Sequence, residues 1–196
     1  MVDDDSILYQ TPGLTIAFDP EAATLVPYGP AERADGNRNY GWTDLRGRPD
    51  LADTIVEGAK SEGLKRMLRA TADAGSDVFS IACECALFPG PGPEWPAWQV
   101  GGFFDISFGD ADRASNRDEL VALAHDVAGR LQFESGHFCT FEFIVRPLKS
   151  WFGQQDCFEL ELKPFGWGAE QATAWRAFDA AAGAVAGALE QRRGAN

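Results

Sequence analysis

The chain has 196 residues, of which 45% are apolar and 24% are charged. These are ordinary values for a globular protein, and they exclude a collagenous, disordered or membrane-spanning chain. Seventeen Lys and Arg are set against thirty Asp and Glu, which gives a formal net charge of −13. This charge excludes most direct nucleic-acid binders, because phosphate neutralisation needs a basic surface. One domain is expected at this length, with residues 1–12 as a flexible acidic N-terminus.

The first residues, MVDDD, carry three aspartates where a secretory signal would need basic residues and a long apolar run. A stretch of 18 apolar residues does not occur in the sequence, so no membrane partner is expected. We therefore expect a cytoplasmic protein whose four cysteines are free thiols in a reducing compartment. Arg outnumbers Lys 13 to 4, which is typical of GC-rich bacterial genomes.

The first third of the chain gives mixed signals. Two short apolar runs within residues 13–28 flank an Asp-Pro-Glu-Ala link, which predicts a β-hairpin. Residues 29–50 show no periodicity and predict a long loop, which at this length is expected to be functional or mobile. Residues 51–74 have apolar side chains at helical spacing, interrupted by Gly58 and Gly63. They predict either one interrupted helix or two short ones.

The rest of the chain is more regular. Four segments alternate apolar and polar side chains as strands do: 77–88, 98–108, 137–147 and 156–164. Asn116 can cap a helix after the second strand, and residues 169–193 predict a final helix rich in Ala and Gly. The order ββαββα predicts an α+β fold, in which an antiparallel sheet has helices packed on one face and an N-terminal hairpin and helix are added.

Alternation on all four strands gives the predicted sheet a second face. This face carries five carboxylates and two cations: Glu84, Asp105, Glu142, Glu159, Glu161, Arg146 and Lys163. Small residues such as Ala82 and Gly101 leave room above it. One interpretation is a plain solvated face, which antiparallel sheets commonly have. The other is an acidic surface that selects a basic ligand or protein by charge.

Tryptophans provide a second functional signal. Four of them lie in loops bounded by Gly or Pro: Trp42, Trp95, Trp151 and Trp167. Aromatic residues in loops are favoured anchors at binding interfaces. Direct connections between the strands would bring Trp95, His137 and Trp167 together at one end of the sheet. The same rings could instead fold back and seal the ends of the core.

Metal and nucleophile sites are weakly indicated. His137 and Cys139 point the same way on one predicted strand, and Cys83 and Cys85 do so on another. Their spacing differs from that of zinc knuckles, and they alternate with Phe and Ile, which indicates core packing. His125, at the border of an apolar helix stripe, is expected to be structural. Nucleotide-binding, serine hydrolase and metalloprotease motifs do not occur, so no cofactor or metal is predicted.

We predict a non-catalytic protein-binding module whose acidic sheet face contacts a basic partner, as an immunity-type protein does when it neutralises a bacterial toxin. The expected contact residues are Glu84, Asp105, Glu142, Arg146, Glu159, Glu161, Trp42, Trp95, Trp151 and Trp167. Two alternatives stay open. The first is a hydrolase or transferase that uses a pair among the carboxylates Glu84, Asp105, Glu142 and Glu159. The second is a small-molecule-binding protein with a pocket lined by Trp95, Trp98 and Trp167.

Overall fold

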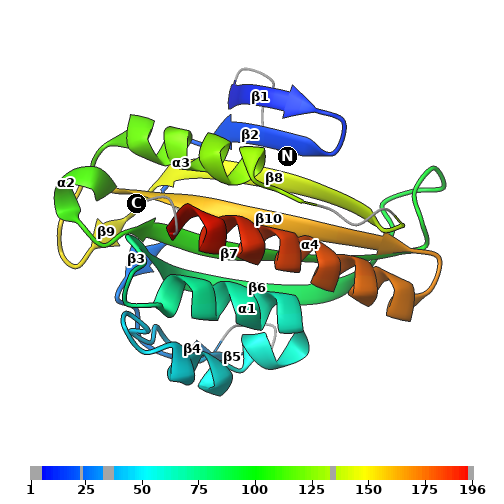
Figure 1. Ribbon diagram of the computed structural model, residues 1–196, viewed down its shortest axis with the longest axis horizontal. Coiled ribbons are helices and arrows are strands. Elements are labelled where there is room, and N and C mark those ends of the chain that lie inside the picture. Colours follow the sequence, from blue (N-terminus) through cyan, green and yellow to red (C-terminus); the bar gives the residue numbers. More distant parts are fainter. Residues whose placement is uncertain (1–5, 23, 33–37, 133–135, 194–196) are drawn as a thin grey trace.

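The centre of the molecule is a six-stranded sheet (Figure 1). The computed structural model describes residues 6–22, 24–32, 38–132 and 136–193. In spatial order the strands are β1 (Ile7–Thr11), β2 (Leu14–Phe18), β8 (Phe138–Pro147), β10 (Phe158–Gly168), β7 (Trp98–Phe108) and β6 (Val78–Pro89). All neighbours are antiparallel except β2 and β8, which are parallel. The predicted α+β fold with a mostly antiparallel sheet is confirmed.

Three long helices cover one face of this sheet (Figure 1). They are α1 (Glu62–Ala72), α3 (Arg117–Gly129) and α4 (Gln171–Arg193). The predicted cap of α3 is present, since the Asn116 side chain accepts a hydrogen bond from the Asp118 amide. None of the helices in the described part of the chain is long and apolar enough to cross a membrane.

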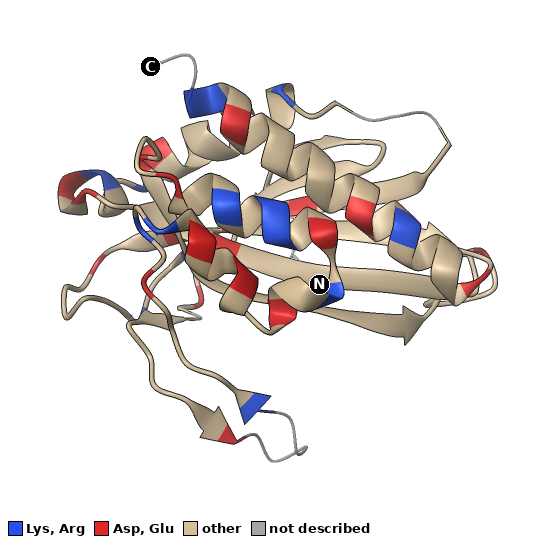
Figure 2. Ribbon diagram, turned by 60° about the horizontal axis from the view of Figure 1, so that its bottom comes forward, with Lys and Arg blue, Asp and Glu red and all other residues tan. Residues whose placement is uncertain are grey.

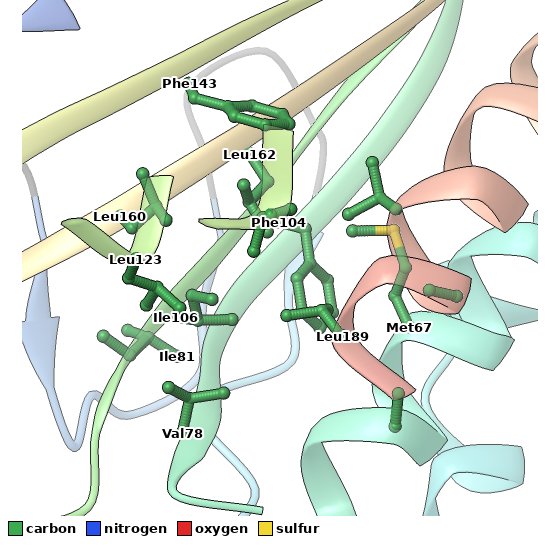
Figure 3. Packing of buried hydrophobic residues seen from close by; sticks show 14 of the residues in the cluster. Met67, Val78, Ile81, Phe104, Ile106, Leu123, Phe143, Leu160, Leu162 and Leu189 are labelled. Atoms are coloured by element: carbon green, nitrogen blue, oxygen red, sulfur yellow. The ribbon is translucent and has the colours of Figure 1, made fainter. Parts of the chain in front are cut away.

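The core lies between the helices and the sheet (Figure 3). Strand residues such as Phe104, Phe143 and Leu160 are fully buried and meet helix residues such as Met67 and Leu189. The small residues of α4 let it approach the sheet closely, as its composition predicts. At Gly166 on β10, an added Cβ would collide with the α4 backbone at Ala174, Ala177 and Phe178. A side chain larger than hydrogen therefore does not fit at this position.

The predicted hairpin over residues 13–28 is wrong. Leu14–Phe18 is a strand, but it pairs with Ile7–Thr11 through a tight turn at Gly13, which has a φ of +90°. The expected flexible N-terminus therefore contributes an ordered strand, while residues 1–5 lie outside the described residues. The second half of the expected hairpin, Leu25–Val26 (β3), pairs instead with Ser150–Trp151 (β9). The physical reason is that β8 offers a longer edge to β2 than the two residues of β3 do.

The described part of residues 29–50, where a long loop is expected, is largely irregular. It contains two short strands, β4 (Ala31–Glu32) and β5 (Arg38–Asn39), which extend away from the body of the molecule (Figure 2). Residues 33–37 lie outside the described residues. The predicted interruption in residues 51–74 is confirmed, since two 3₁₀ helices, η2 (Pro49–Thr54) and η3 (Glu57–Lys60), precede α1. A short helix, α2 (Ala111–Ala114), precedes α3.

Candidate functional site

Strand register brings the predicted acidic residues together on the face opposite the helices. Asp105 on β7 lies directly opposite Glu161 on β10, and Glu159 on β10 lies opposite Arg146 on β8. Residues paired in this way point to the same side of a sheet, with side chains about 5 Å apart at Cβ. Ala82 on β6 is opposite Asp105, so a small side chain borders this cluster, as the sequence predicts.

A register shift on β6 changes the face to which Phe79 points. Strict alternation would put Phe79 on the helix-covered face, with Ile81. The pairing with β7 is irregular between Ser80 and Ala82. Phe79 consequently lies opposite Ser107 rather than on the face of Phe104 and Ile106. Its ring contacts the Trp42 ring at 6.4 Å between centroids. A β-bulge of this kind moves the preceding side chains to the other face, and alternation alone cannot locate it.

The second face is covered in part. Described residues of the segment 19–60 pack on its middle and along the β6 edge, and backbone hydrogen bonds hold the first part of this covering segment in place. The Asp19 amide donates to the Val145 carbonyl at 2.9 Å, and the Lys149 amide donates to the Thr24 carbonyl at 2.7 Å. The solvated-face interpretation is therefore wrong for the middle of the sheet.

Two aromatic side chains of the covering segment also bond to β6. Trp42 Nε1 donates to the Ser80 carbonyl at 3.2 Å, and the Tyr28 hydroxyl donates to the Ile81 carbonyl at 3.3 Å. These carbonyls lie at the bulge, on an edge strand of the sheet. Side-chain donors thus satisfy part of the exposed edge and fix the covering segment against it.

A cavity of about 730 Å³ lies between the covering segment and the sheet. Asp105, Glu161 and Arg146 line it from the sheet, and Tyr28, Tyr40 and Trp42 line it from the covering segment. Among the described residues, four carboxylates and four cations line the cavity, so a ligand there meets both signs of charge. Its volume is that of a site for a small molecule.

Three carboxyl groups at or next to the cavity are withdrawn from solvent. Glu159 is 0% exposed, Asp105 4% and Glu161 8%. Charged residues are rarely buried to this extent unless they are paired. Of the three, Glu161 has an ion pair: Arg146 Nη2 lies 2.7 Å from its Oε2 and 3.3 Å from Asp19 Oδ2. Arg146 therefore pairs with Glu161 and Asp19.

Several polar atoms of this cluster have no hydrogen-bond partner among the described residues. They are Asp105 Oδ1, both carboxyl oxygens of Glu159, and Arg146 Nε. Thr24 lies near enough to Glu159 to favour the ionised form slightly, but the contact falls short of a well-formed hydrogen bond. Unpartnered buried polar atoms cost free energy, and in native proteins they commonly mark a functional site.

Burial and mutual repulsion raise two of the carboxyl pKa values. The pKa of Asp105 is raised well above its ordinary value, first by burial and then by the charges of Glu159 and Glu161. The pKa of Glu159 rises to about 8, again mainly through burial, although Arg146 opposes the shift. A carboxyl with such a pKa keeps its proton at neutral pH. It can then donate a hydrogen bond or act as an acid.

The remaining acidic residues predicted for the site lie around this buried centre. Glu84 lines the cavity from β6. Glu142 lies opposite Lys163 in the sheet, with 3.7 Å between Oε2 and Nζ, and its side chain is 42% exposed. The structure therefore divides the predicted acidic face into a buried part, Asp105, Glu159 and Glu161, and an outer part.

The four tryptophans that were predicted to lie in loops form two clusters at opposite ends of the sheet. The prediction is wrong for Trp151, which lies in β9, and for Trp167, which lies in β10. At one end, the Trp95 ring lies 4.5 Å from the Trp167 ring and 6.0 Å from the Phe138 ring. Trp95 covers Trp167 there, so this pair seals one end of the second face, while Trp95 itself stays partly exposed. At the other end, Phe152 contacts both Trp42 and Trp151, at 5.4 and 5.1 Å.

The cavity is not where a tryptophan-lined pocket was expected. Its lining includes Trp42, but not Trp95, Trp98 or Trp167. The tyrosines that line it, Tyr28 and Tyr40, were missed by sequence reasoning. Their one signal is that they lie, with Trp42, in a Gly-rich segment without periodicity.

Cys83 and Cys85 do not come together with His137 and Cys139 to form a metal site. All four are free, and Cys83 and Cys85 on β6 are separated from Cys139 on β8 by two strands, β7 and β10. Burial raises the pKa of Cys85 and of Cys139 to about 11, which keeps both as thiols. The described ranges contain no group of three His, Cys, Asp or Glu that could hold a metal ion.

Comparisons with known proteins do not assign the site. No family model matches the chain, and no curated protein and no solved structure matches it either.

Proposed function

We propose that this protein binds a small molecule in the cavity over β7 and β10, and that Asp105 in its protonated form donates a hydrogen bond to it. The observation that carries this proposal is the Asp105 carboxyl, which lines a cavity of about 730 Å³ and has a buried Oδ1 without a partner. A protein seldom keeps such a group without a use for it.

The other lining residues support the same proposal. The Glu161–Arg146 pair can orient polar groups of a ligand, and the rings of Tyr28, Tyr40 and Trp42 can cover its flat or apolar part. With Asp105 protonated, the described lining holds three carboxylates and four cations, so both signs of charge are present and nearly cancel. The favoured ligand is therefore a neutral or zwitterionic molecule that carries a hydrogen-bond acceptor.

Two substitutions at one position test this role. Asp105→Asn keeps a hydrogen-bond donor of the same shape, whereas Asp105→Leu removes it. Ligands found by saturation-transfer NMR from a library of neutral and zwitterionic amides and amino acids should bind the wild type and Asp105→Asn, and should bind Asp105→Leu at least about tenfold more weakly, the equivalent of one hydrogen bond. Glu142→Gln, on the same face outside the cavity lining, is the matched control and should bind normally.

The pH dependence of binding gives an independent check. Affinity for the wild type should fall as the pH rises through the raised pKa of Asp105, because the ionised carboxyl cannot donate. Affinity for Asp105→Asn should not change over the same range, apart from changes that Glu142→Gln shows too. Equal binding by the wild type and Asp105→Leu at every pH would contradict the proposal.

Acid–base catalysis is a second candidate. It is favoured by the pairing of Asp105, whose pKa is raised, with Glu161, which lies beside Arg146. A carboxyl with a raised pKa can act as an acid, and a second carboxyl beside it gives the site a candidate for the base. A hydrolase or transferase of this kind would lose turnover in Asp105→Asn while still binding its substrate, which separates it from a binding protein.

Binding of a basic protein stays a prediction. The net charge of −13 supports it, and so does the exposure of Glu142 and Trp95. The burial of Asp105, Glu159 and Glu161 restricts the surface for a protein partner to the outer residues of the face.

A further inference from the structure

One arginine of the chain lies among three aromatic rings. The guanidinium carbon of Arg46 is 5.9 Å from the ring centroid of Trp42, 5.1 Å from that of Phe79 and 5.0 Å from that of Phe152. The rings come from the covering segment, from β6 and from the turn after β9. Asp44 completes the arrangement, since Arg46 Nε and Nη2 donate to its two oxygens at 2.9 and 2.7 Å.

The three rings form a preassembled cage. The ring centroids of Trp42 and Phe152 are 5.4 Å apart and those of Phe79 and Phe152 are 5.9 Å apart, with interplanar angles of 77° and 42°. Trp42 is fixed by its hydrogen bond to the Ser80 carbonyl, and the Phe152 amide donates to the Val26 carbonyl at 2.6 Å. The positions of the rings therefore depend on contacts that do not involve Arg46.

Arg46 is held more loosely than the cage. Within the described residues, its guanidinium hydrogen bonds go only to Asp44, two residues away, and the two side chains are 41% and 44% exposed. An exposed ion pair of this kind contributes little stability. When the arginine side chain swings into solvent, it loses its contacts with the three rings and with Asp44, but the contacts that hold the rings in place remain.

We propose that Trp42, Phe79, Phe152 and Asp44 form a binding site for a guanidinium from outside the chain, which Arg46 occupies in the free protein. Rings within about 6 Å of an organic cation attract it through their negative faces, and several rings around one cation are used to recognise such groups. Asp44 gives the incoming cation the same two-point contact that it now gives Arg46.

The favoured source of this guanidinium is an arginine on the surface of another protein. A chain with a net charge of −13 attracts basic surfaces, and the cage lies where an arginine side chain can enter from solvent. This inference does not depend on a ligand in the cavity, and it gives the predicted basic partner a specific point of contact. Displacement of Arg46 would be part of the binding step.

Emptying the cage is the direct test. N-acetyl-arginine amide is titrated into the wild type and into Arg46→Ala, and binding is measured by isothermal titration calorimetry, a readout that does not depend on Trp42. In the wild type, the probe can bind only to the fraction of molecules in which Arg46 has left the cage, and this lowers its apparent affinity. Arg46→Ala should therefore bind the probe at least about tenfold more tightly. N-acetyl-citrulline amide, which has the same shape without the charge, should not bind.

Three variants serve as controls. Arg38→Ala removes another exposed arginine, which lies 5.6 Å from the single ring of Tyr40, and it should not change the affinity for the probe. Arg46→Gln keeps a longer uncharged side chain, so it should show the gain in affinity even if the cage collapses in Arg46→Ala. The double variant Trp42→Leu, Arg46→Gln should lose the binding that Arg46→Gln gains. Equal affinity of the wild type, Arg46→Ala and Arg46→Gln for the probe, or equal binding of the citrulline amide, would overturn the proposal.

A second arm identifies the source of the guanidinium. A peptide with one arginine between lysines is compared with N-acetyl-arginine amide on Arg46→Ala. A protein source predicts tighter binding of the peptide, with an advantage that falls as salt is added. If the amide binds as tightly as the peptide, the protein source is wrong and the site takes a free guanidino compound.

Discussion

The two faces of the central sheet are covered by different kinds of chain. On one face, α1, α3 and α4 lie over apolar side chains such as Phe104 and Leu162 (Figures 1 and 3). On the other face, largely irregular described residues of 19–60 cover only a part, over Asp105, Glu159 and Glu161, and leave a cavity. The first face buries apolar side chains, which stabilises the fold. The second face buries carboxyl groups, which does not, and such exceptions concentrate at functional sites.

The largest effect is expected from a cavity in the helix-covered face. Phe104 on β7 is fully buried beneath the helices and lies opposite Leu162 of β10 in register. Phe104→Ala should lower the free energy of unfolding by about 3–5 kcal/mol, because it removes buried apolar surface and leaves a void. Urea denaturation of the variant measures this loss. A change below 1 kcal/mol would mean that this face is not the stabilising core.

Overpacking the same face should cost somewhat less. Gly166→Ala forces a methyl group against the α4 backbone at Ala174 and Phe178. The strand and the helix must separate, which is expected to cost about 1–3 kcal/mol. Gly92→Ala, at a loop position with open space around it, is the matched control and should be nearly neutral. Thermal denaturation of both variants tests the close approach, and equal melting temperatures would contradict it.

On the cavity-bearing face, a substitution is expected to raise the free energy of unfolding rather than to lower it. Glu159 has a raised pKa of about 8, so the folded protein keeps a proton that the unfolded chain releases near pH 4.5. Its contribution to stability is fully present below pH 4.5 and is lost as the pH rises towards 8. Glu159→Gln cannot ionise, and at pH 8.5 it should be more stable than the wild type by about 1–3 kcal/mol.

A pair of denaturation series checks this prediction. The advantage of Glu159→Gln over the wild type should nearly disappear at about pH 3.5, below the ordinary pKa of 4.5, where the wild-type carboxyl is mostly protonated in both the folded and the unfolded state. Glu142→Gln, at an exposed position on the same face, should change stability by no more than about 0.5 kcal/mol at either pH. If Glu159→Gln were destabilising at pH 8.5, the ionised carboxylate would be well accommodated and the account of this face would fail.

The sequence predicted the helix-covered face well because its elements are regular. Alternation located β6, β7, β8 and β10, and helical periodicity located α3 and α4. The same alternation placed Asp105, Glu142, Glu159 and Glu161 correctly on the second face. The bulge that turns Phe79 to that face could not be predicted, because a register shift depends on pairing with a neighbouring strand rather than on local sequence.

The cover of the second face could not be predicted either. Segment 19–60 is irregular, and its position depends on single contacts such as Trp42 with the Ser80 carbonyl and the pairing of β3 with β9. These contacts join residues far apart in the chain, and a sequence carries no periodic signal for them. Without the cover, Glu159 reads as a surface carboxylate, whereas in the structure it is buried.

The central claim is that the covered face holds carboxyl groups that keep their protons at neutral pH. Carbon-13 NMR of the Asp and Glu side-chain carboxyls, followed from pH 3 to pH 10 with Asp105→Asn and Glu159→Gln for assignment, tests it most directly. The account predicts that the Glu159 signal moves near pH 8 and that the Asp105 signal moves well above its ordinary range, while Glu142 serves as the exposed reference. If Asp105 and Glu159 both titrated near pH 4, the covered face would be an ordinary ionised surface and the account would be contradicted.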